Sequence, residues 1–299
     1  MTEELYAIPV IFAIGVLLYG IVAVGMFIFQ RHIVYRPEGV PAPPEANDVP
    51  EIREVLFRTT DGLALAAWWA PPASVGAPTV LLLHGNSGNR AWTARKIRVY
   101  LDAGYGIFAP DYRGFGGNPG SPSEVGLQND ALAARAFIIR EGIDESALFY
   151  HGESLGSGVA NWLAAQHPPR GLILDAAFSS LADAAQEMYP WLPVRPIIWD
   201  RFPSVEYLRT HQSPLLILHG EKDDTISYEH SERLLAAHSG PKQRVAFPEG
   251  SHNDLYDYGA GAIVVSWIHD QMYNSTESGP AAVHMSAPLV KGEPPSPAS

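Results

Sequence analysis

Short apolar runs alternate with longer helical patterns over most of the chain. The runs with strand character are Thr79–Leu83, Gly106–Ala109, Leu148–His151, Gly171–Asp175, Leu215–His219 and Arg244–Phe247. The helical patterns lie near Ala91–Ala103, Ser123–Arg140, Gly156–His167, Leu181–Met188, Tyr228–His238 and Leu255–Tyr273. Apolar strands that alternate with helices are typical of a mostly parallel sheet covered by helices on both faces. The pattern therefore predicts an α/β fold.

Two earlier segments extend this domain toward the N-terminus. Glu51–Thr60 and Leu63–Ala70 have the character of strands and are joined by an Asp-Gly turn, which is a hairpin signal. We therefore expect one domain over residues 51–273, preceded by a Pro-rich linker over residues 37–50. Residues 274–299 are rich in Pro, Ala, Ser and Gly without periodicity, and we expect them to be disordered.

The N-terminal segment Tyr6–Phe29 is almost wholly apolar and carries no charge. As a helix rising about 1.5 Å per residue, it is long enough to cross the roughly 30 Å hydrocarbon core of a membrane. A cleaved signal peptide is the alternative, but its apolar region would be shorter, and the preceding residues 1–5 are acidic. We therefore predict a single-pass anchor over residues 1–36. Arg31 and Arg36 follow the helix, which favours a cytoplasmic location for the rest of the chain.

Composition and charge exclude several kinds of site. Acidic residues outnumber basic ones by 32 to 20, giving a net charge of −12, so nucleic acid is not an expected partner. The chain has no cysteine, which excludes disulfides, thiolate metal sites and a cysteine nucleophile. Nothing in the sequence specifies an oligomeric state.

A G-x-S-x-G pattern occupies Gly152-Glu-Ser-Leu-Gly156, between a strand-like run and a helical pattern. A serine on so sharp a turn has a strained backbone, and glycines two positions before and after it leave room for the turn. The following helix supplies free N–H groups suited to a developing oxyanion. Ser154 is therefore a candidate nucleophile, and the alternative is a Gly-rich turn that merely contains serine.

A serine nucleophile needs a base, and the base needs an orienting acid. In an α/β sheet both come from loops at the carboxyl ends of later strands. Asp223 and Asp224 follow one such strand, and we favour Asp223 as the acid, the other carboxylate being a helix cap. His252, on a Gly-containing loop after the next strand, is the candidate base. Three other histidines are expected to be structural: His84, His151 and His219.

Two backbone N–H groups are candidate oxyanion donors. One belongs to Leu155, directly after the nucleophile. The other belongs to Asn86, in the loop that follows the strand Thr79–Leu83; a solvated Gly/Asn turn is the alternative. Asp111 and Arg113 follow another strand, and we expect them to pair and to hold their loop rather than to take part in chemistry.

These motifs together resemble the α/β-hydrolase superfamily and, within it, the membrane-anchored BEM46-like branch of the animal ABHD13 and ABHD17 type. The shared motifs are Tyr35-Arg-Pro37, His84-Gly-Asn-Ser-Gly-Asn89, Asp111-Tyr-Arg-Gly-Phe-Gly116, Pro122-Ser-Glu-Val-Gly126, Gly152-Glu-Ser-Leu-Gly156, Tyr189-Pro-Trp-Leu-Pro193 with Asp200-Arg-Phe202, His219-Gly-Glu-Lys-Asp223 and Gly250-Ser-His-Asn253. The resemblance covers nearly all of residues 6–272. It implies a Ser154-Asp223-His252 triad with oxyanion donors at Asn86 and Leu155, and a hydrolase that needs no cofactor and no metal.

The sequence departs from the family pattern at two places. Ser227 stands where the family commonly has proline after the acid loop. The region Trp191–Phe202, part of a short cap near residues 185–205, lies where such enzymes carry a lid, so we expect an open site. Its aromatic side chains either pack on the domain or the membrane surface or contact the substrate.

We therefore expect a membrane-anchored serine hydrolase that cleaves ester or thioester bonds of small-molecule or lipidic acyl substrates through an acyl-enzyme. A serine peptidase is the alternative of the same fold, because the same triad cleaves amides. A catalytically silent membrane scaffold is the alternative from another class. A competent residue at every triad and oxyanion position favours the enzyme.

Overall fold

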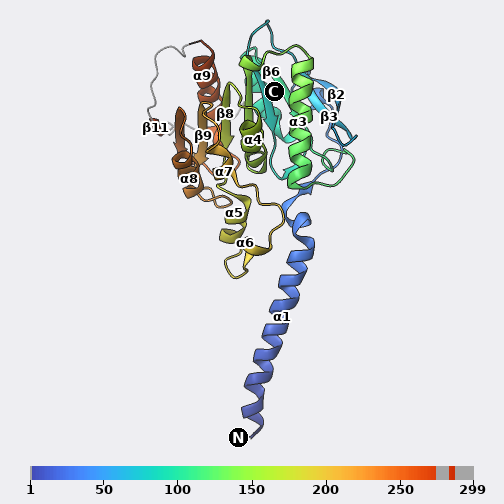
Figure 1. Ribbon diagram of the computed structural model, residues 1–299, viewed down its shortest axis with the longest axis vertical. Helices are drawn as coiled ribbons and strands as arrows, with labels where there is room; N and C mark the ends of the chain where they lie inside the picture. The colour runs from blue at the N-terminus through green and yellow to red at the C-terminus, as the bar shows by residue number, and fades with distance from the viewer. Residues whose placement is uncertain (1, 274–282, 287–299) are drawn as a thin grey trace, which may run out of the picture.

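The computed structural model describes residues 2–273 and 283–286, which form a sheet layered between helices and one long projecting helix (Figure 1). Within this part of the chain, one nine-stranded sheet has the order β11-β10-β9-β8-β7-β4-β6-β3-β2. All neighbouring strands are parallel except β2–β3 and β3–β6, which confirms the predicted mostly parallel sheet. The strands are β2 (Arg53–Arg58), β3 (Ala64–Ala70), β4 (Thr79–Leu83), β6 (Gly106–Pro110), β7 (Leu148–Glu153), β8 (Gly171–Asp175), β9 (Leu215–Gly220), β10 (Lys242–Phe247) and β11 (Val283–Ser286).

Helices cover both faces of the sheet, and the strands therefore have two buried faces. In β4, Leu81 and Leu83 belong to the apolar cluster on one face, while Val80 and Leu82 belong to the cluster on the other. This alternation explains why the strands are continuous apolar runs in the sequence. The covering helices are α2 (Ala94–Asp102) and α9 (Ala260–Tyr273) on one face, and α3 (Glu124–Arg140), α4 (Leu155–Gln166) and α8 (Glu229–Ala237) on the other.

The chain between β8 and β9 forms three short helices: α5 (Leu181–Met188), α6 (Val194–Ile197) and α7 (Ser204–Leu208). Figure 1 shows α5 and α6 on the side of the domain from which the long helix projects. Only α5 was predicted, since a helix as short as α6 or α7 shows no helical repeat in the sequence.

The long helix α1 (Thr2–Val34) includes an apolar stretch, Pro9–Val34, with a mean hydropathy of 2.6, long enough to cross a membrane. Its C-terminal half packs against the segment around α6. Arg31 forms a salt bridge with Asp200, with Nε and Oδ2 2.9 Å apart. Directly after the helix, Tyr35 is buried in the core of the domain. The predicted anchor is thus docked on the domain rather than loosely tethered to it.

The predicted disordered tail falls largely outside the described residues, since 274–282 and 287–299 are not among them. Its residues Val283–Ser286 form β11, which pairs in parallel with β10 at the edge of the sheet. The expectation of disorder is therefore wrong for these four residues. The tail pattern lacks periodicity, and a single edge strand of this length leaves no such signal.

Helix α4 approaches the sheet so closely that only glycine fits at two positions. A Cβ on Gly156 would lie 2.0 Å from the carbonyl oxygen of Leu83, and one on Gly152 would lie 2.4 Å from the carbonyl oxygen of Gly156. Both neighbouring atoms are backbone and cannot turn aside. The close approach fixes the position of the β7–α4 turn relative to β4.

A buried charge network lies beside this turn. The Nζ of Lys96, from α2, is 2.7 Å from Oδ2 of Asp175 and 3.0 Å from Oε2 of Glu153. The ring of His151 lies 2.9 Å from the same Asp175 oxygen, and its Nδ1 is 2.6 Å from the hydroxyl of Tyr100. Burial opposes ionisation of Asp175, but His151 and Lys96 outweigh it and hold the pKa of its carboxyl below the usual range. The network joins the strands β7 and β8 to helix α2 beneath the site.

We expect Gly156→Ala to destabilise the fold by roughly 3 kcal/mol or more, because the added methyl overlaps backbone atoms that have no room to move. The measurement is the thermal unfolding midpoint of the detergent-solubilised protein. Gly39→Ala is the matched control, since a Cβ at Gly39 has nothing within 4 Å. Equal midpoints for the two variants would contradict the close packing of α4.

Asp175→Asn is expected to lower stability at pH 7 by roughly 3 kcal/mol, because it removes a buried carboxylate that pairs with the ammonium of Lys96. The pKa of Asp175 in the folded state lies below its value of about 3.9 in the unfolded chain. The stabilisation by the ionised carboxylate is therefore complete above about pH 3.9 and is lost as the pH falls toward the folded-state pKa. The difference between wild type and variant should therefore shrink below about pH 4. Urea unfolding at several pH values measures it. Asp102→Asn, at an exposed surface pair, is the control, and a difference that does not depend on pH would rule out the linkage.

Candidate active site

The G-x-S-x-G motif forms the turn between β7 and α4. Ser154 has φ 48° and ψ −114°, a conformation that non-glycine residues rarely adopt. Its backbone N–H donates to the carbonyl of Asp175, 3.0 Å away, which ties the turn to the neighbouring strand. Leu155 is the first residue of α4, so its N–H has no partner within the helix. The turn thus presents a serine hydroxyl beside a free N–H group.

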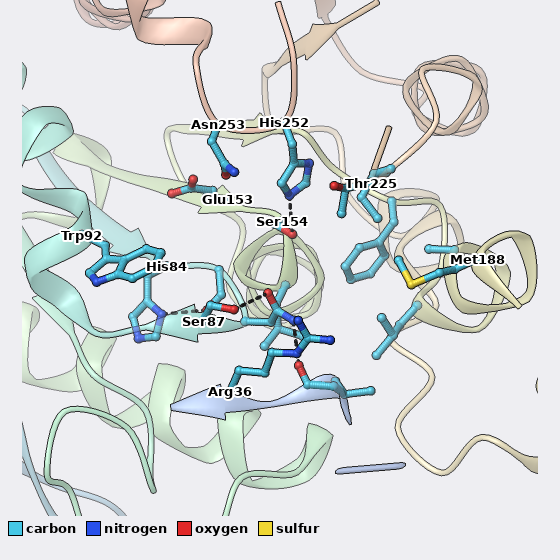
Figure 2. Close-up of a pocket in the computed structure, with 18 of the residues that line it drawn as sticks. Arg36, His84, Ser87, Trp92, Glu153, Ser154, Met188, Thr225, His252 and Asn253 are labelled. Carbon is cyan, nitrogen blue, oxygen red and sulfur yellow. Dashed lines mark hydrogen bonds between the residues drawn. The ribbon is translucent and has the colours of Figure 1, made fainter. Parts of the chain in front are cut away.

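The predicted base and acid lie in line with this serine. His252 Nε2 is 3.1 Å from Oγ of Ser154, and His252 Nδ1 is 2.8 Å from Oδ2 of Asp223. Figure 2 shows the His252 ring directly above the Ser154 hydroxyl. The carboxylate of Asp223 accepts from the backbone N–H groups of Thr225 and Ile226 through its other oxygen, at 2.9 and 2.8 Å. Its position is therefore fixed from both sides.

Asp223 is buried, whereas the neighbouring Asp224 is exposed and is not in contact with the histidine. Burial raises the pKa of Asp223, but hydrogen bonds from His219 and His252 outweigh it and hold this pKa below its usual range. The carboxylate is therefore ionised at neutral pH and can orient an imidazole through Nδ1. The geometry favours Asp223 over Asp224.

The loop with the second predicted oxyanion donor is held by the segment that follows α1. The side-chain amide of Asn86 donates to the carbonyl of Val34 at 2.8 Å, and the N–H of Arg36 donates to the carbonyl of Asn86 at 2.8 Å. Just beyond, β1 (Arg36–Pro37) pairs in parallel with β5 (Ser87–Gly88). These bonds use the side-chain amide and the carbonyl of Asn86. Its backbone N–H has no acceptor within the described part of the chain.

The predicted pair of Asp111 and Arg113 does not form. Arg113 binds Asp130 and Asp61, with its shortest contacts to both at 2.7 Å, and the buried Asp111 binds Arg90 instead. Proximity in sequence was a poor guide here because each of the two side chains pairs with a residue from another segment of the chain. The loop is still architectural, as expected, but through long-range ion pairs.

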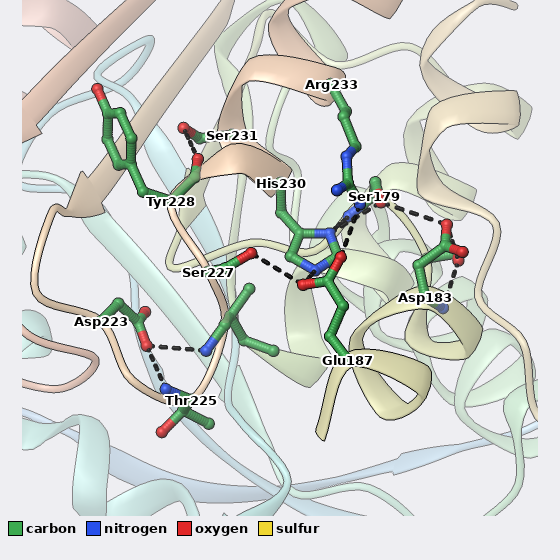
Figure 3. Close-up of polar contacts among 12 residues, drawn as sticks. Ser179, Asp183, Glu187, Asp223, Thr225, Ser227, Tyr228, His230, Ser231 and Arg233 are labelled. Atoms are coloured by element: carbon green, nitrogen blue, oxygen red, sulfur yellow. Dashed lines mark hydrogen bonds and ion pairs between the residues drawn. The ribbon is translucent and has the colours of Figure 1, made fainter. Parts of the chain in front are cut away.

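Ser227, the departure from the family pattern, connects the acid loop to α5. Its hydroxyl donates to Glu187 Oε2 at 2.9 Å, a contact that proline would not make. Figure 3 shows the same carboxylate also contacting His230 and Arg233, at 3.1 and 3.0 Å. A burial penalty on Glu187 is outweighed by bonds from Ser227 and Arg233, so its pKa is lowered. The substitution replaces a rigid residue with a polar link to the cap.

A cavity of about 580 Å³ opens above Ser154. In Figure 2, Met188 and Thr225 lie on one side of the serine and Trp92 lies on the other. Apolar side chains from α1 and α5 line part of the cavity, and the rest of its lining includes the charged and polar groups of Arg36, Arg95, Lys96, Glu153 and Asn253. The cavity therefore suits a substrate with one apolar and one polar part.

Two further residues lie near the triad: His219, which was expected to be structural, and Lys96, which sequence reasoning missed. His219 Nε2 lies 3.4 Å from Asp223 Oδ2 and bonds the carbonyl of Ile226, so it supports the acid loop. Lys96 reaches the elbow from α2 through Glu153. The four-residue spacing of His219 and Asp223 at a strand end was available as a signal, whereas Lys96 gave none. No cluster of potential metal ligands occurs among the described residues.

Comparisons with known proteins agree with this architecture. Residues 78–210 match the family model described as alpha/beta hydrolase fold. The uncharacterized protein Rv2307c of Mycobacterium tuberculosis is 39% identical over 252 residues, which are 83% of this chain and 89% of that protein. Protein bem46 of Schizosaccharomyces pombe is 29% identical over 254 residues, 78% of this chain and 84% of that protein. The solved structure of the esterase Pf2001 of Pyrococcus furiosus shares the fold, with a TM-score of 0.65 and 20% identity over 80% of this chain and 100% of that one. The chain thus belongs to the α/β-hydrolase superfamily and, within it, to the BEM46-like branch.

Proposed function

We propose that the protein is a membrane-anchored serine hydrolase that cleaves ester or thioester bonds of acyl substrates. The observation that carries the proposal is the continuous hydrogen-bonded line from Asp223 through His252 to Ser154, with separations of 2.8 and 3.1 Å. The 3.1 Å separation lies within the range for proton transfer from a serine to its base, and the 2.8 Å separation lets the carboxylate orient the imidazole. The esterase among the structural neighbours has the same fold, which agrees with the proposal.

In the proposed reaction, Ser154 Oγ attacks the substrate carbonyl carbon while His252 Nε2 takes the hydroxyl proton. The carbonyl oxygen becomes an oxyanion that accepts from the N–H groups of Leu155 and Asn86. As the intermediate collapses, the bond to the leaving alcohol or thiol breaks and His252 returns the proton to it. Water, deprotonated by the same imidazole, then releases the acid and restores the serine.

The proposal predicts that a fluorophosphonate probe labels the detergent-solubilised protein at Ser154. Ser154→Ala and His252→Ala should each abolish labelling, and Asp223→Asn should slow ester hydrolysis by roughly 10⁴-fold, because the imidazole loses its orienting partner. Asp224→Asn is the matched control and should react like wild type. A folded wild type that stays unlabelled would overturn the proposal in favour of a scaffold, and selective turnover of amides would identify a peptidase.

Activity should fall on the acid side of neutrality, since a protonated imidazole cannot accept the serine proton. The pKa of Asp223 is held below its usual range, so only one ionisation should govern this limb. A plot of log(kcat/KM) against pH is then expected to rise with a slope of one and to level off. A rate independent of pH across the acid range would argue against His252 as base.

A further inference from the structure

The apolar wall of the catalytic cavity is built partly by the anchor helix itself. Ile33 and Val34, the last residues of α1, line the cavity together with Ala185, Met188 and Tyr189 from the α5 side. The helix therefore contributes surface to the site as well as attachment.

A second, smaller cavity continues this wall down the helix. It shares Ile33, Val34, Ala185 and Tyr189 with the catalytic cavity. From there the smaller cavity extends between α1 and the cap. No charged residue lines it among the described residues. Its further apolar lining residues are Met26 and Phe27 of α1, and Leu192, Val194, Ile197 and Ile198 of the cap. The two cavities are thus adjacent and share one apolar wall, which leads from beside Ser154 along α1; we call this surface the groove.

Contacts between α1 and the cap fix the walls of this groove. Gln30 Oε1 accepts from the N–H of Trp199 at 2.7 Å, and the Tyr19 hydroxyl donates to the carbonyl of Trp191 at 3.1 Å. Tyr19 precedes Val34 by fifteen residues, or about 22 Å of helix at 1.5 Å per residue, so the cap follows α1 well into its apolar stretch.

The same part of the cap exposes large aromatic side chains. Trp191 and Trp199 are 50% and 47% exposed, and they lie against Tyr19 and Phe27 of the helix. Tryptophan and tyrosine in this position are typical of the interface between membrane and water. With the apolar part of α1 in the bilayer, the lower end of the groove faces lipid rather than water.

We infer that the groove admits the acyl chain of a bilayer-resident ester or thioester, which enters sideways from the membrane along α1 and not from water. The inference rests on the proposed function. The chain lies between α1 and α5, the carbonyl reaches Ser154, and the polar remainder of the lipid lies against Lys96, Glu153 and Asn253. The substrate class is a membrane lipid or lipidated molecule with a long acyl chain.

The test compares two esters in phosphatidylcholine vesicles that hold the full-length protein. p-Nitrophenyl butyrate reaches the site from water, and p-nitrophenyl palmitate is dissolved in the bilayer. Met26→Trp obstructs the smaller cavity from α1, and Ile197→Trp obstructs it from the cap; neither residue lines the catalytic cavity. Ile28→Trp is the matched control, since Ile28 belongs to the same helix, is 54% exposed and lines neither cavity.

Each obstructing variant is expected to lower the palmitate-to-butyrate ratio of kcat/KM at least tenfold, whereas the control stays within twofold of wild type. Retained butyrate turnover verifies that the variants are folded. An unchanged ratio in both obstructing variants would overturn the lateral route while leaving the hydrolase intact. A wild type inactive on both esters would overturn the proposed function and this inference with it.

Discussion

The packing of the first turn of α4 on the backbone of β4 is the constraint on which the site depends. At Gly156 the two backbones touch, and the absent side chain lets the helix begin directly above the sheet edge. Ser154 is forced into its positive φ by this contact, and its hydroxyl consequently stands clear of the sheet. The acid and base loops follow β9 and β10 at the same edge, so parallel strand order alone brings them within reach of the serine.

The charged groups around this turn form two clusters, one buried within the fold and one that faces the cavity. On the α2 side, Lys96, Asp175 and His151 are buried together and balance one another. On the other side, His252 has its Nδ1 occupied by a carboxylate and its Nε2 directed at a hydroxyl. Both clusters pair an imidazole with an aspartate, but only the second leaves a ring nitrogen facing the cavity. Accessibility, and not residue type, distinguishes the pair that we propose to be reactive.

Local patterns in the sequence predicted much of this structure. Thr79–Leu83, Gly171–Asp175 and Leu181–Met188 form elements with the bounds expected, because burial on both faces or amphipathic spacing marks them in the sequence itself. Ser154 and His252 could be named as candidates because chain order, turn residues and strand ends restrict such sites to few positions, and the structure brings the two side chains to 3.1 Å.

Features that depend on distant partners were not predictable in this way. Arg113 is joined to Asp61 and Asp130, and nothing in its neighbourhood distinguishes these from the nearer Asp111. The edge strand β11 and the short helices of the cap exist through tertiary contacts and leave no periodic signal. The packing of Lys96 beside the elbow requires the helix α2 to be placed in space first.

The bonds between Asn86 and the segment after α1 couple the position of the long helix to the geometry of the candidate site. Val34 and Arg36 hold the loop that carries the proposed oxyanion donor Asn86, and Tyr35 is buried in the core of the domain. A protease that cut the chain near this point would release a fragment with a displaced loop and a gap in its core. Under the proposed function, detachment from the membrane and loss of activity would then be a single event, and a shed soluble form would be inert.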